Sequence, residues 1–70
     1  MPIAIAPKDT ALKIVKILAD EKLKTHLSNL GILENGEITV VSKEAGSTIV
    51  LVKGVKLALD RNLSTKILVG

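Results

Sequence analysis

The chain has 70 residues, which suits a single domain over residues 1–70 and leaves no room for a linker. It contains no cysteine, which excludes disulfides and thiolate metal sites. It also lacks Phe, Tyr and Trp, so a core must be filled with Val, Ile, Leu and Ala. The formal charge of +3 is mildly basic, but the lysines are scattered, which gives only a general preference for anionic partners.

The sequence has no segment suited to a membrane. No apolar run approaches the roughly 18 to 20 residues needed to cross a bilayer. Residues 1–7 also lack the charged region with which a signal peptide begins. We therefore expect a cytoplasmic protein that does not insert into the membrane.

The first half predicts a strand and then a short helix. Residues 12–18 mix β-branched residues with lysines, which is typical of a strand. Asp20 is expected to cap the helix that follows, and Gly31 to end it. Leucines recur there at steps of four and three, forming one stripe: Leu23, Leu27 and Leu30. A helix this short is marginal alone, so the stripe must pack on the strands.

The second half predicts four more strands, separated by turn residues such as Asn35-Gly36 and Lys53-Gly54. The strands are expected at residues 37–42, 48–52, 55–59 and 67–69. The run at 48–52 is apolar throughout, which predicts cover on both faces. One capped helical turn is expected at residues 60–64. Five short strands and one helix favour a mainly β, small, closed or nearly closed barrel.

The order of these signals resembles the FeoA family of ferrous-iron-transport accessory proteins. Members have a strand, a helix that ends in Leu-Gly-Ile, a glycine turn, a hairpin and a late short helix. Here the motif is Leu30-Gly31-Ile32, and Asn35-Gly36 stands where the family commonly has Pro-Gly. The resemblance covers nearly the whole chain and implies an SH3-like five-stranded barrel. His26 stands where members usually carry Arg, and a neutral imidazole cannot make a forked, permanently charged contact.

Catalytic and cofactor motifs are not found. There is no nucleophile with a supporting base, no phosphate-binding glycine loop and no metal-ligand spacing, so a non-enzymatic protein without cofactor or metal is expected. His26 is interpreted as a surface residue; a weak metal site with a nearby carboxylate is the alternative. Arg61 is interpreted as a solvated charge; an arginine finger toward a GTPase is the alternative.

The lysines bear on nucleic-acid binding. They could follow a phosphate backbone if they converged on one side, but solvated strand faces are the simpler interpretation. With no aromatic residue for base stacking, binding of single-stranded nucleic acid loses its usual energetic basis. No nucleic-acid partner is therefore predicted.

The exit of the helix is the candidate partner-binding site. One short helix cannot bury every apolar residue there, and the exposed ones are expected to form an interaction patch. The alternative is that all four apolar residues belong to the core, which is favoured most for Leu30. The site comprises His26, Leu27, Leu30, Gly31, Ile32 and Leu33. Pairing of two copies through exposed leucines, as a weak homo-oligomer, is left open.

The resemblance implies the partner and the role. By that resemblance, the partner would be the membrane ferrous iron transporter FeoB, on whose cytoplasmic, GTPase-containing part the module would dock to regulate uptake. The alternative is a barrel associated with an iron-dependent repressor or nucleic acid. That interpretation requires an upstream helix-turn-helix, which this sequence does not contain.

Overall fold

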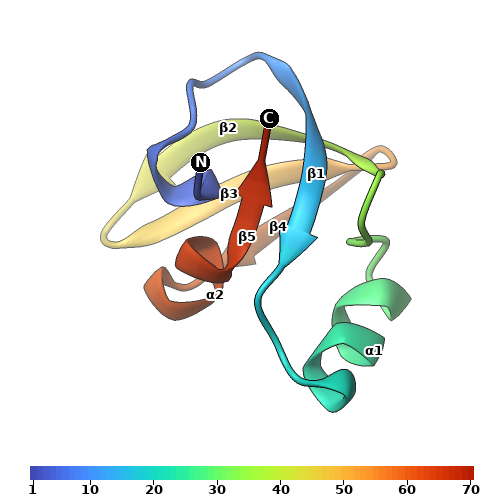
Figure 1. Ribbon diagram of the computed structural model, residues 1–70. Coiled ribbons are helices and arrows are strands. Elements are labelled where there is room, and N and C mark those ends of the chain that lie inside the picture. Colours follow the sequence, from blue (N-terminus) through green and yellow to red (C-terminus); the bar gives the residue numbers. More distant parts are fainter.

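The computed structural model describes residues 1–70 and consists of one curled antiparallel sheet with two short helices (Figure 1). The five strands lie in the order β4-β3-β2-β1-β5. The elements are η1 (Ile3–Ile5), β1 (Ala11–Ile17), α1 (Glu21–Asn29), β2 (Glu37–Glu44), β3 (Ser47–Val52), β4 (Val55–Leu59), α2 (Arg61–Lys66) and β5 (Ile67–Val69). The predicted mainly β fold, with a helix after the first strand and another before the last, is confirmed. The short 3₁₀-helix η1 was not predicted.

Two tight hairpins join β2 to β3 and β3 to β4. In the second, both turn residues have positive φ, 51° at Lys53 and 80° at Gly54. This is the type I′ geometry, whose twist matches that of the flanking strands. The turn therefore sets the register of β4 on β3, in which Val52 faces Val55 and Val50 faces Leu57.

The expectation that β3 is covered on both faces was wrong. Val50 and Val52 are buried on its inner face, whereas Leu51 on the outer face is 38% exposed. Successive side chains of a strand point to opposite faces, and only the inner face of this sheet is covered by other elements. In this protein, an uninterrupted apolar run therefore does not indicate a strand that is buried on both faces.

The barrel is nearly closed. On one side, β5 meets the N-terminal residues, with Pro2 bridged to Leu68. On the other side, β4 pairs with β3 alone. The sheet thus keeps one free edge, at β4, as the expectation of a closed or nearly closed barrel allows.

The core is aliphatic throughout. Its buried hydrophobic residues come from every strand, from α1 and from the N-terminal segment. Ile3 and Ala6 are buried and seal one end, while Ile5 between them is 68% exposed. The N-terminal segment therefore belongs to the barrel through Ile3 and Ala6, while Ile5 points to solvent.

Both helices begin as predicted, at aspartate caps. One Asp20 carboxylate oxygen accepts from the Leu23 amide at 2.8 Å, and Asp60 accepts from Leu63 at 2.7 Å. Each bond satisfies an amide that lacks a partner in the first helical turn. The caps therefore fix where α1 and α2 start after β1 and β4.

Candidate partner-binding site at the exit of helix α1

The chain leaves α1 through a closed hydrogen-bonded motif. The Ile32 amide donates to the Leu27 carbonyl at 2.9 Å, and the Gly31 amide donates to the Ser28 carbonyl, also at 2.9 Å. With Gly31 at φ +93°, this is the Schellman arrangement, in which the residue after the glycine packs on the residue five positions before it. Here these residues are Ile32 and Leu27, both buried.

The motif divides the predicted site residues into two groups. Leu27 is 1% exposed and Ile32 is fully buried. Leu30 and Leu33 are 41% and 39% exposed, and His26 is also exposed. Gly31 is half-buried and lies between the exposed Leu30 and the buried Ile32 in the chain. Leu27 and Ile32 therefore anchor the exit, and the other three side chains are available to a partner.

Gly31 offers a stability test, because a Cβ there would lie 3.2 Å from the Val52 side chain. Gly54 has a similar φ of +80° but nothing within 4 Å of a Cβ. We expect Gly54→Ala to cost about 1–2 kcal/mol, from the left-handed conformation alone. Gly31→Ala should cost more in urea unfolding, because Val52 must also move. Equal losses would show that the contact with β3 is unimportant.

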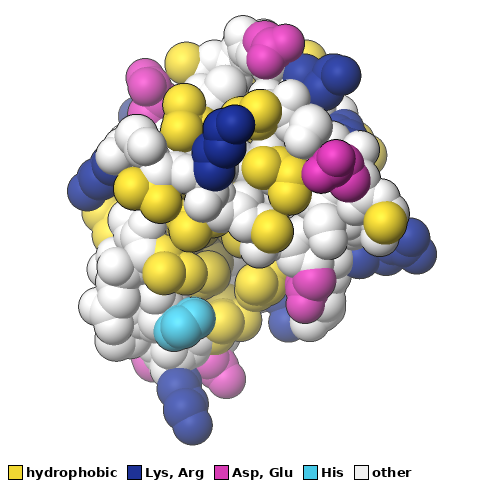
Figure 2. All heavy atoms as spheres, turned by 180° about the vertical axis from the view of Figure 1, so that it is seen from behind, with side chains coloured by type: hydrophobic (Ala, Val, Ile, Leu, Met, Phe, Trp, Pro, Cys, Tyr) yellow, Lys and Arg dark blue, Asp and Glu magenta, His cyan; other side chains and the backbone are white.

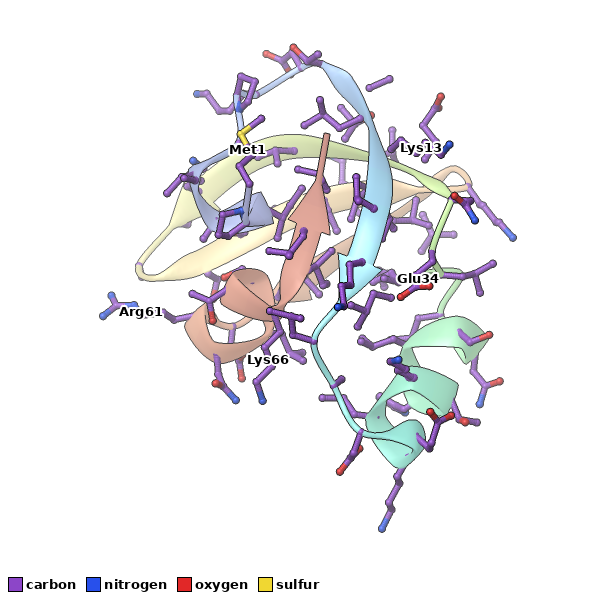
Figure 3. The ribbon with its side chains drawn as sticks, in the orientation of Figure 1. Met1, Lys13, Glu34, Arg61 and Lys66 are labelled. Carbon is purple, nitrogen blue, oxygen red and sulfur yellow. The ribbon has the colours of Figure 1, made fainter.

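The loop after the exit is held against β1. Asn35 donates its amide to the Ile14 carbonyl at 2.7 Å, and Ile14 donates to the Gly36 carbonyl at 2.8 Å. A Glu34 carboxylate oxygen accepts from the Ile17 amide at 3.4 Å, and Figure 3 shows Glu34 between the end of β1 and α1. Leu33, just before these bonds, is therefore presented from a fixed backbone.

Leu33 lines a cleft between α1 and the end of β1, which we call the exit cleft. Its volume is about 410 Å³, and its lining includes the buried residues Ile17 and Ile32. Lys24 and Glu34 supply one charge of each sign at its edge. This combination suits an apolar side chain of a partner flanked by polar groups.

His26 lines a second cleft, of about 350 Å³, with Asp20, Lys22 and Leu23. Lys24 and His26 lie two residues apart, so they point to different flanks of α1. Seen from behind, hydrophobic side chains gather beside the histidine around a hollow (Figure 2). The structure thus places His26 and Leu33 in separate clefts, whereas the sequence reasoning grouped them.

Val55 is an exposed apolar residue that the sequence reasoning did not include. Its side chain is 56% exposed and it faces Val52, whose side chain lies beside Gly31. The start of β4 therefore lies next to the helix exit. Val55, Leu57 and Leu59 alternate along β4 and share its inner face, but only the tertiary structure determines that Val55 is left uncovered by other elements.

The other candidate residues show no assembled chemistry. No group of three or more His, Asp or Glu side chains could hold a metal ion. Arg61 is exposed, and its guanidinium lies near Gly46 at the tip of the β2–β3 hairpin. In Figure 3 its side chain points outward from α2. It lies in a different part of the molecule from the helix exit.

A comparison with protein-family models matches the FeoA domain over residues 1–70. The chain belongs to the FeoA family. The sequence-based assignment is thereby confirmed, including its association with ferrous iron transport. A search of the curated proteins gave no match. No helix of this FeoA domain is long and apolar enough to span a membrane.

Solved structures agree with the fold. A FeoA iron uptake regulatory protein is 23% identical, with TM-score 0.86 over 100% of this chain and 93% of that one. The FeoA protein of Stenotrophomonas maltophilia, a prokaryotic SH3 domain protein solved with zinc, is 20% identical, with TM-score 0.82 over 100% and 89%. The iron(II) transport protein A of Clostridium thermocellum is 15% identical, with TM-score 0.89, and this chain spans 44% of it. These likenesses establish the SH3-like fold.

The same fold occurs in larger regulators. A manganese-dependent transcriptional repressor is 17% identical, with TM-score 0.85 over 99% of this chain and 40% of the repressor. The FeoA domain therefore corresponds to one part of that protein.

Proposed function

We propose that this FeoA domain is a non-enzymatic module of ferrous iron uptake that docks on the cytoplasmic, GTPase-containing part of FeoB. Family membership supports the iron-transport context. The main support for the proposed docking surface is the Schellman motif at the exit of α1. It buries Leu27 and Ile32 and leaves Leu30 and Leu33 exposed. The proposal places the protein in the cytoplasm.

The regulatory effect follows from differential binding. A docked module can shift FeoB between two conformations only by binding one of them more tightly. Leu30 and Leu33 are suited to this because the backbone that carries them is already ordered by hydrogen bonds. Little conformational entropy is then lost when the partner covers them. The revised contact set is His26, Leu30 and Leu33.

An NMR titration of the isotope-labelled chain with the cytoplasmic domain of FeoB tests this proposal. We expect amide shifts concentrated between His26 and Leu33. A parallel titration with ferrous iron alone should leave these amides unchanged. Iron-induced shifts confined to His26 and Asp20 would support the metal alternative. Docking at the helix exit is overturned if the FeoB domain causes no shifts or shifts only remote residues.

The repressor-like fold gives the second candidate, a barrel associated with nucleic acid. It is supported by the structural likeness to the manganese-dependent repressor. Adding duplex DNA to the labelled chain at low salt is its test. Shifts at lysine-bearing strands that vanish as salt is raised would favour it, because phosphate contacts depend on counterion release.

A further inference from the structure

The outer edge of β4 is the open edge of the sheet. At the opposite edge, the β5 residue Val69 donates its amide to the Met1 carbonyl at 2.7 Å, and Pro2 bridges Leu68. β4 has β3 on one side and no strand on the other. Val55, Lys56 and Ala58 along it are exposed. An edge of this kind is a template for pairing with another strand.

The turn geometry determines which backbone groups are free. A two-residue type I′ turn is closed by a hydrogen-bonded pair, here Val52 with Val55. Hydrogen-bonded pairs alternate along an antiparallel ladder, so Leu57 bonds to β3 and its neighbours do not. The N–H and C=O groups of Lys56 and Ala58 therefore point outward. No backbone hydrogen bond outside the sheet uses them.

We propose that a second copy of the chain pairs with this edge, β4 to β4, antiparallel about a two-fold axis at Leu57. Lys56 and Ala58 are symmetric about Leu57, so this register places Lys56 of each copy opposite Ala58 of the other. All the outward N–H and C=O groups of both residues then find partners. A shift of the register by one residue would leave them unpaired.

Side chains agree with this register. On the inner face, the half-buried Leu57 lies opposite Leu57 of the second copy, and the exposed Val55 lies opposite Leu59, which is buried within its own chain. On the outer face, each Lys56 faces a small alanine. Its diagonal neighbours in the second copy are Asp60, which attracts it, and the other Lys56, which repels it. Diagonal pairs interact more weakly than directly opposed pairs, so the contact of Lys56 with Ala58 matters most for this register.

The pairing should be weak and strengthened by salt. A five-residue edge buries far less than the roughly 1,600 Å² of a standard interface, so a dissociation constant on the order of 1 mM is expected. Each copy carries a formal charge of +3, and salt screens their mutual repulsion. Lysine on a short edge limits pairing with other strands, which agrees with a weak association.

Sedimentation equilibrium and amide hydrogen exchange of the isolated chain, without FeoB, test the proposal independently of docking. With rising concentration, we expect the average mass to increase and the Lys56 and Ala58 amides to become protected. Ala58→Pro removes an outward donor that the β3 ladder does not use, and should weaken association at least about tenfold, or 1.4 kcal/mol. Ala58→Ser keeps the amide and should associate like the parent chain.

Several results would overturn the proposal. One is a chain that stays monomeric at millimolar concentration, and another is association that weakens as salt is raised. A third is association of Ala58→Pro as strong as that of Ala58→Ser. If Ala58→Pro does not fold, the proposal is tested by the protection of the Lys56 and Ala58 amides in the parent chain. Protection that does not change with concentration would then contradict pairing at this edge.

Discussion

Replacing Leu27 with alanine is expected to lower the free energy of unfolding by about 2–5 kcal/mol. Leu27 is 1% exposed and belongs to the core cluster, so the substitution removes buried contacts and leaves a cavity. In Figure 1, α1 stands apart from the sheet, which makes its few buried anchors important. A domain of this size has little stability to lose, so the variant should be partly unfolded at ambient temperature.

Leu30→Ala is the matched control, with the same change of residue one helical turn later. Leu30 is 41% exposed, so the variant should lose less than about 1 kcal/mol. Urea unfolding followed by circular dichroism measures both values. Similar losses for the two variants would mean that Leu27 does not anchor α1.

The strands and turns were predictable because their causes are local. Alternating side chains, the pairs Asn35-Gly36 and Lys53-Gly54, and capping by Asp20 and Asp60 each act within a few residues. The structure has a strand, a turn or a cap at each of these places. The predicted bounds of β4 and β5 agree with the structure, while β2 extends two residues further, to Glu44.

The division of the apolar residues at the helix exit was only partly predictable. The leucine stripe placed Leu27 and Leu30 on one face of a helix, and Leu30 was favoured for the core. The structure reverses this order, because Leu27 is buried and Leu30 is exposed. The Schellman rule, applied to Gly31, would have paired Leu27 with Ile32 and assigned both to the core. The exposure of Leu33 and Val55 has no local signal, since it depends on which strands and loops surround them.

The free edge of β4 shows another limit of local reasoning. Five strands with regular turns suggest a barrel, but whether the last edges meet depends on sheet coiling and on the N-terminal residues. Here residues 1 and 2 occupy the edge of β5, and nothing occupies that of β4. A closed or nearly closed barrel was expected, and the structure is the nearly closed one, with β4 as its free edge.

Leu30→Glu and Leu33→Glu are each expected to weaken binding of the FeoB cytoplasmic domain at least about tenfold, or 1.4 kcal/mol. Each substitution places a charge where an apolar side chain would be covered by the partner, and the charge would have to be desolvated. Both leucines are exposed, so stability should change little. These variants are better tests than Leu27→Glu, which would introduce a charge into the core.

Ile5→Glu is the control, because Ile5 is 68% exposed in η1, a segment on the other side of the barrel from α1 (Figure 1). Isothermal titration calorimetry with the FeoB domain should give unchanged affinity for this variant. Loss in Leu33→Glu alone would place the partner in the exit cleft, and loss in Leu30→Glu alone would place it on the His26 side. If both bind like Ile5→Glu, the helix exit is not the docking surface. Equal loss in all three would instead indicate a nonspecific effect of added negative charge.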